Sequence, residues 1–236
     1  YTTAGTYLVK VSGTMKAYRR VKSEDIAGQN LLTHIRSFGK LGIKSFRYAF
    51  YNCTGLISVP KYCPKNISSM YYMFRGCSGA AFNPDVSAWD VSNVKDMAFM
   101  FFQCSGAAFN PDVSEWNVGN VTDMRYMFCY CSGDAFNPNV SNWNVSNVET
   151  MASMFSKCSG AAFRGGRGIS GTGITNWTPD SLTLASSFMI QSKKQQDGFL
   201  DLILITWAAL IGDPSHPLPE KITISFGTNT YTTAAF

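Results

Sequence analysis

The tripeptide Cys-Ser-Gly recurs four times with a spacing of 27 residues, beginning at Cys77, Cys104, Cys131 and Cys158. When the coils 77–103, 104–130 and 131–157 are aligned, 16 of the 27 positions are identical. A unit this short cannot bury its own apolar residues and gains stability by stacking on its neighbours. The repeat therefore predicts a solenoid in which like residues of successive coils lie above one another.

Each coil divides into two halves with different apolar periods. The first half, from Phe82 to Val91, contains proline and reads as a short extended segment or strand. In the second half, apolar residues between Val94 and Cys104 recur at helical spacing, and Asn93 occupies the position of an N-cap. We therefore expect a right-handed α/β repeat of about five to six coils, with capping elements at both ends.

Three regions are predicted along the chain. Residues 1–45 are expected to form an N-terminal strand and a capping layer, and residues 46–190 the repeat solenoid. Residues 191–236 are expected to close the stack with a helix at 198–211 and a strand at 221–226. The last coils carry an insertion, a glycine-rich loop that contains Arg164 and Arg167.

Composition excludes several classes of protein. Aromatic residues make up 14% of the chain, which rules out intrinsic disorder. The longest apolar stretch, 198–212, is shorter than the ~20 residues needed to cross a bilayer, so no membrane insertion is expected. The net charge of +5 comes from scattered lysines and arginines near the N-terminus, which we interpret as a solvated edge rather than a nucleic-acid site. Because the chain begins at Tyr1 and not at methionine, we expect it to be part of a longer protein.

The seven cysteines favour buried free thiols over disulfides. Their number is odd, and stacked coils point neighbouring side chains in parallel. A linear column of thiols also cannot form the tetrahedral site that zinc prefers. Calcium is the better metal hypothesis, with Asp85, Asp112 and Asp90 as weak candidates, although Asx side chains also close turns. No cofactor is expected.

Catalysis has little support in the sequence. The two histidines, His34 and His216, lie outside the repeat, and no nucleophilic triad can be assembled from residue spacing. Asp85 and Asp112, one coil apart, imitate the carboxylate pair of a glycosidase, but any ladder of acids would do so. We predict that the protein is not an enzyme, and keep a polysaccharide-cleaving enzyme as the third hypothesis.

Differences between the copies indicate a candidate binding surface, because core positions are expected to stay fixed while exposed ones drift. One drifting column is mostly aromatic, and such a stripe suits stacking on sugars or docking to a protein. The alternative is packing between coils or against a neighbouring domain. The candidate ligand-binding residues are Tyr48, Tyr72, Phe99, Tyr126, Tyr130, Arg164 and Arg167.

A family resemblance rests on the run FNPDVSAWDVSNVKDMAFMF and its copies. These repeats resemble the BspA-like leucine-rich class of bacterial surface proteins, which is also described as a domain of unknown function in mycoplasma lipoproteins. The resemblance covers residues 46–163, and partly 174–189. The opening segment YTTAGTYLVKVSG also resembles the last strand of a PKD-like sandwich.

The resemblance implies a leucine-rich-repeat-like solenoid on a bacterial cell surface or in a phage virion, for example in a tail fibre. It implies a non-catalytic adhesion module that binds a cell-surface glycan or protein. The alternative hypothesis is a structural spacer or assembly domain that packs on sister subunits of an oligomer in a virion or surface fibre.

Overall fold

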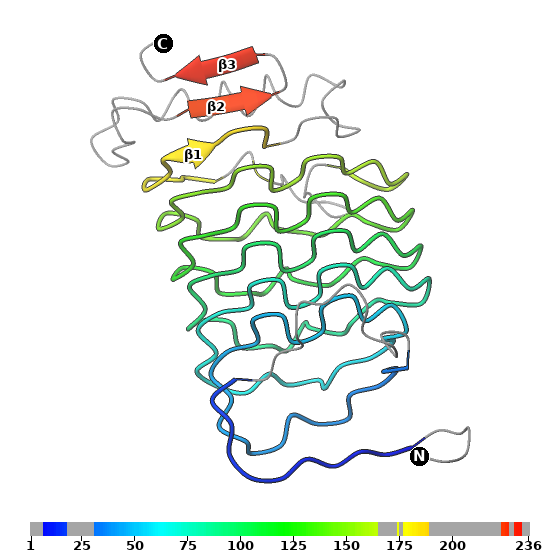
Figure 1. Ribbon diagram of the computed structural model, residues 1–236. Coiled ribbons are helices and arrows are strands. Elements are labelled where there is room, and N and C mark those ends of the chain that lie inside the picture. Colours follow the sequence, from blue (N-terminus) through cyan, green and yellow to red (C-terminus); the bar gives the residue numbers. More distant parts are fainter. Residues whose placement is uncertain are drawn as a thin grey trace.

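The computed structural model describes residues 7–17, 31–164, 174, 177–188, 223–226 and 229–232. In these residues the chain winds through successive coils that lie one on the next, and Figure 1 shows them stacked from the blue N-terminal end to the red C-terminal strands. A continuous series of parallel bridges joins each coil to its neighbour, through Ala17, Ser45, Ser69, Asp96, Asp123, Thr150 and Leu184. The series begins before residue 46, so the described part of the N-terminal layer belongs to the same stack.

Three short strands continue this ladder at the C-terminal end. The strand β1 (Leu184–Ala185) pairs in parallel with β2 (Thr223–Phe226), and β2 pairs antiparallel with β3 (Asn229–Thr232). The strand β2 lies within the segment 221–226 that was expected to be extended. The helix expected at 198–211 lies outside the described residues. The strand expected near the start is absent from residues 7–11, which are exposed.

The second half of each repeat is not helical, in contrast to the prediction. Residues 98–103 form turns instead, and Asp96 before them bridges to the coils on either side. The amide of Phe99 donates to the carbonyl of Arg125 in the next coil. Two residues later, the amide of Phe101 donates to Met127 in the same way. Phe99 also has a φ of 58°, a left-handed conformation that a right-handed helix excludes. Alternate amides therefore bind the neighbouring coil, whereas the amides between them, such as that of Met100, bind a carbonyl three residues earlier in their own coil.

Columns of identical side chains form the core. The phenylalanines Phe74, Phe101, Phe128 and Phe155 stack with ring centroids 5.5 Å apart. The tryptophans are also in register, because the indole N–H of Trp116 donates to the Val86 carbonyl and that of Trp143 to the Val113 carbonyl. The methionines of the repeats are fully buried, as expected for core residues. Like side chains thus lie above like side chains, turn after turn.

The cysteine column is buried and hydrogen-bonded. All seven cysteines are free thiols in the structure. The Cys104 thiol donates to the Phe74 carbonyl of the preceding coil at 3.1 Å, and the Cys131 thiol donates to Phe101 at the same distance. Burial raises the pKa of both thiols well above the ordinary value. Each thiol therefore stays protonated and holds its coil to the previous one.

The glycine of each Cys-Ser-Gly triplet marks the closest approach between coils. An ideal Cβ on Gly106 would lie 2.2 Å from the carbonyl oxygen of Gly79, and one on Gly133 would meet Gly106 in the same way. Only a residue without a side chain fits at such a separation. Among the described residues, no helix is long and apolar enough to span a membrane.

Candidate functional site

The drifting aromatic column forms a continuous stack, which we call the aromatic ladder: Tyr48, Tyr72, Phe99 and Tyr126. Successive ring centroids are 5.1, 4.5 and 4.6 Å apart, with interplanar angles of 17°, 13° and 8°. All four residues have left-handed φ values between 56° and 58°. Each lies at a turn between two cross-coil hydrogen bonds, which align the rings from one coil to the next.

The left-handed backbone does not by itself require an aromatic residue at this position. A non-glycine residue in this conformation costs about 1–2 kcal/mol, and a stacked aromatic pair contributes about 0.5–1.5 kcal/mol. Stacking therefore offsets part of the strain. However, Ser153 occupies the same column with a φ of 56°. The fold thus accepts a small polar residue where the ladder carries rings.

The rings of the ladder are half-buried and cover one another's faces. A stack with such small interplanar angles presents ring edges and tyrosine hydroxyls to solvent. The inner rings, Tyr72 and Phe99, therefore have no free face on which a sugar could stack. This geometry favours contact through edges and hydroxyls. Burial raises the pKa of Tyr72, so its phenol remains protonated and can donate a hydrogen bond.

Cationic side chains lie against the rings beside the ladder. The Arg75 guanidinium packs between two aromatic residues of its own column, 4.9 Å from the centre of Tyr51 and 5.2 Å from that of Phe102. It also donates a hydrogen bond to the Tyr51 hydroxyl. At the far end of this face, Lys157 lies 4.4 Å from the centre of the Tyr130 ring. These cation–π contacts place the two cationic side chains against the aromatic face.

The opposite margin of the ladder carries a charged network. Arg47 lies 4.2 Å from the centre of the Tyr71 ring and forms a 2.8 Å ion pair with Asp96, two coils away. Asp123 pairs with Arg125 at 2.9 Å. Burial is the largest influence on Asp123 and raises its pKa, although Arg125 opposes the change. The Arg47–Asp96 pair ties separate coils together at the edge of the aromatic surface, whereas the Asp123–Arg125 pair lies within one coil.

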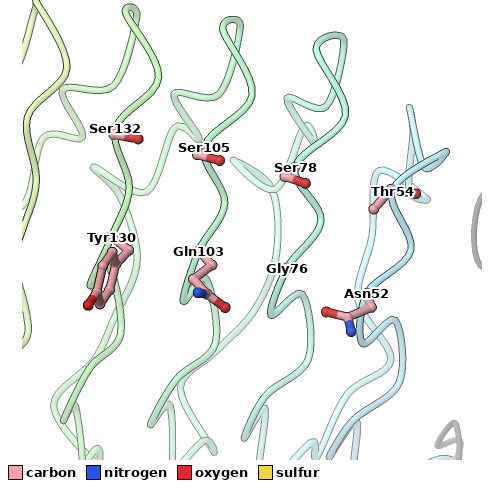
Figure 2. A pocket seen from close by; sticks show the side chains of 8 residues that line it. All are labelled: Asn52, Thr54, Gly76, Ser78, Gln103, Ser105, Tyr130 and Ser132. Atoms are coloured by element: carbon pink, nitrogen blue, oxygen red, sulfur yellow. The ribbon is translucent and has the colours of Figure 1, made fainter. Parts of the chain in front are cut away.

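A polar groove runs alongside, with a volume of about 470 Å³. Two columns of residues line it, one on each side of the buried cysteines, and Figure 2 shows them as parallel rows that cross successive coils. One row contains hydroxyl side chains at one position of each coil. The other row consists of residues with a left-handed backbone, three of which carry an amide or phenol group and one of which is Gly76. The lining residues are Asn52, Thr54, Gly76, Ser78, Gln103, Ser105, Tyr130 and Ser132.

Of these lining residues, the sequence analysis identified Tyr130 alone. The serines were missed because positions that are identical in every copy were assigned to the core. Ser78, Ser105 and Ser132 are in fact exposed. The repeat did contain an indication that these serines are exposed, because each is a polar residue between the buried cysteine and the glycine that contacts the next coil. Identity between copies therefore does not distinguish a core position from an exposed one here.

The remaining predicted residues are not joined to this surface. Arg164 is exposed, and its amide donates to the Asn137 side chain in the preceding coil. Arg167 lies outside the described residues. Asp85 and Asp112 each accept hydrogen bonds from the serine two residues later, which closes a turn.

Asp90 makes the same bonds with Ser92, and they lower its pKa. These contacts match the turn-closing alternative for all three calcium candidates. Across the described part of the chain, no group of three or more histidine, cysteine or acidic side chains could hold a metal ion.

The stacked coils hold like side chains in internal columns and place both repeated and variable residues on the outside, which is the arrangement of a repeat protein. The chain belongs to the family described as Mycoplasma protein of unknown function, DUF285, whose profile matches residues 44–165. No curated protein and no solved structure matches the chain.

Proposed function

We propose that this chain is a non-catalytic recognition module that binds a glycan or protein on a cell surface. One observation supports the proposal most directly. Aromatic, cationic and polar side chains occupy neighbouring, partly exposed columns across successive coils. Ser153 occupies the ladder position of a later coil with the same left-handed φ, so the backbone does not require an aromatic residue there. Rings that the backbone does not require are available for binding.

The proposal includes the class and setting of the protein. We place the chain in the BspA-like group of leucine-rich-repeat-like solenoids, as a part of a bacterial surface protein or a phage virion appendage. The repeat pattern supports this placement, and so does the mixed aromatic and basic character of the face. Tyrosine and arginine are the residue types most enriched where binding energy is concentrated in interfaces.

The test uses substitutions that the fold already tolerates. Phe99→Ser and Tyr126→Ser together place at two positions the residue that Ser153 provides in the next coil. The labelled chain is added to a panel of intact bacterial and animal cells, and bound fluorescence is measured by flow cytometry. We expect apparent affinity to fall about tenfold or more. The control variant is Glu115→Ala, because Glu115 is exposed and alanine occupies its position in the preceding coil, at Ala88.

Two outcomes would contradict the proposal. In one, the wild-type chain binds none of the cells. In the other, the serine variant binds cells as well as wild type but loses self-association in light scattering. That second result would identify the face as a contact between sister subunits and would favour a structural spacer.

A further inference from the structure

The polar groove contains side chains that the fold leaves uncommitted. Within the described residues, no hydrogen bond is recorded for the hydroxyls of Ser78, Ser105 and Ser132 or for the side-chain amide of Gln103. By contrast, Ser87 bonds to the Asp85 carboxylate. The groove serines are identical in each copy and exposed, yet they close no turn. Their hydrogen-bonding capacity faces the groove.

The chemistry of the lining selects an uncharged, hydroxyl-rich ligand. Every lining residue is neutral, and most carry a hydroxyl or an amide. These groups both donate and accept hydrogen bonds, as sugar hydroxyls do. Tyr130, 39% exposed, adds a phenol at one end of the groove, where Lys157 covers a face of its ring. A row of hydroxyl and amide groups can bind the hydroxyl edge of a pyranose.

The spacing of the groove also favours a polymer. Its lining comes from four coils, each of which contributes one residue to each row (Figure 2). Side chains in the ladder beside it repeat every 4.5–5.1 Å. An extended chain of β-1,4-linked pyranoses advances by about 5 Å per sugar, close to the spacing between paired strands. One sugar can therefore meet a hydroxyl side chain of the same row in each coil.

We infer that the groove binds an extended, uncharged β-1,4-linked polysaccharide along the stacking direction, with one sugar over each coil. The inference rests on the proposed recognition function and names its ligand class. The hydroxyl row and the Gln103 amide bind sugar hydroxyls, and Tyr130, with Lys157 against its ring, borders the polymer at one end. The aromatic ladder lies beside this polymer rather than beneath it.

The test measures binding of β-1,4-linked gluco-, manno- and N-acetylglucosamine oligosaccharides by isothermal titration calorimetry. For at least one series, we expect affinity to rise with each sugar up to about four, the number of coils that line the groove, and then to level off. The α-1,4-linked glucose hexamer, which curls rather than extends, is expected to bind at least about tenfold more weakly.

The diagnostic variant combines Gln103→Gly with Ser105→Ala. Glycine is compatible with position 103 because Gly76 occupies the same column at a φ of 72°. The matched control is Ser159→Ala, in the serine column but outside the groove lining. We expect the groove variant to lose about tenfold or more in affinity, and the control to bind within about twofold of wild type.

The inference is overturned if wild type binds no extended oligosaccharide, if affinity does not depend on length, or if the groove variant binds like the control. Cell binding separates this failure from that of the proposed function. If wild type binds cells but no oligosaccharide, recognition stands and the groove assignment fails. If it binds neither, both fail.

Discussion

Replacing Gly106 with alanine tests how closely the coils approach one another. The added Cβ would lie 2.2 Å from the Gly79 carbonyl oxygen and 3.0 Å from its carbon. A carbon–oxygen contact of ordinary length is about 3.3 Å, so the two backbones must separate by about 1 Å. That movement strains the neighbouring bond from the Ala108 amide to the Ala80 carbonyl, which is already 3.2 Å long. Overpacking and a weakened hydrogen bond together predict a loss of about 3 kcal/mol in unfolding free energy.

The matched control is Gly119→Ala. A Cβ there would lie 3.3 Å from the Asn117 side-chain oxygen, and the aligned residues in the adjacent coils are Ser92 and Ser146. We expect its stability to stay within about 0.5 kcal/mol of wild type. Urea unfolding followed by tryptophan fluorescence gives both values, and the midpoint of thermal unfolding should fall by about 6–12 °C for Gly106→Ala alone. Equal stability of the two alanine variants would refute the close packing described here.

Two further predictions concern the core. Burial raises the pKa of Cys63 to about 12 and that of Cys129 to about 11, so folding requires neutral thiols. The contribution of these neutral thiols to the free energy of unfolding is therefore fully present below the ordinary thiol pKa near 9. It is lost as the pH rises from 9 towards the raised pKa values of the folded state. In this pH range each thiol lowers the free energy of unfolding by about 1.4 kcal/mol per pH unit. Cys63→Ala should therefore make the decline in unfolding free energy between pH 9 and 11 shallower. An unchanged slope would contradict this. Trp116→Phe removes the donor to the Val86 carbonyl and leaves a cavity, and chemical denaturation should report a loss of about 2–3 kcal/mol; a loss below about 0.5 kcal/mol would show that this bond is not formed.

The register of the columns could be predicted because identical residues recur at a fixed period. Stacking coils of equal length places Trp116 beneath Trp143 whatever the local backbone conformation. The helix could not be excluded from the pattern, because two successive turns bury the same positions as a helix does. Met97, Met100 and Phe101 are fully buried in the observed turns, as they would be on one helical face. The difference lies in which carbonyls the amides bind, and apolar spacing does not report that.

The candidate site was predicted only in part, for a related reason. The aromatic ladder was found because its residues differ between copies while remaining aromatic. Ser105 and its equivalents were missed because repetition was taken as evidence of burial. In a ladder, however, an exposed residue can repeat as strictly as a core residue. The column of Gln103 varies between copies, which indicates an exposed position, but Asn52, Gly76 and Tyr130 in that column share only a left-handed backbone, so no side-chain chemistry repeats.

The insertion between Phe163 and Trp177 leaves the columns on either side undisturbed. The Phe163 ring stacks 5.5 Å from Phe136, and the Trp177 ring lies 6.2 Å from Trp143 at an angle of 3°. Extra residues at this point of a coil are therefore accommodated without a change of register. Peptides can therefore be inserted at this position of the coil. Related chains can differ in the length of the insertion while the columns on either side keep their register.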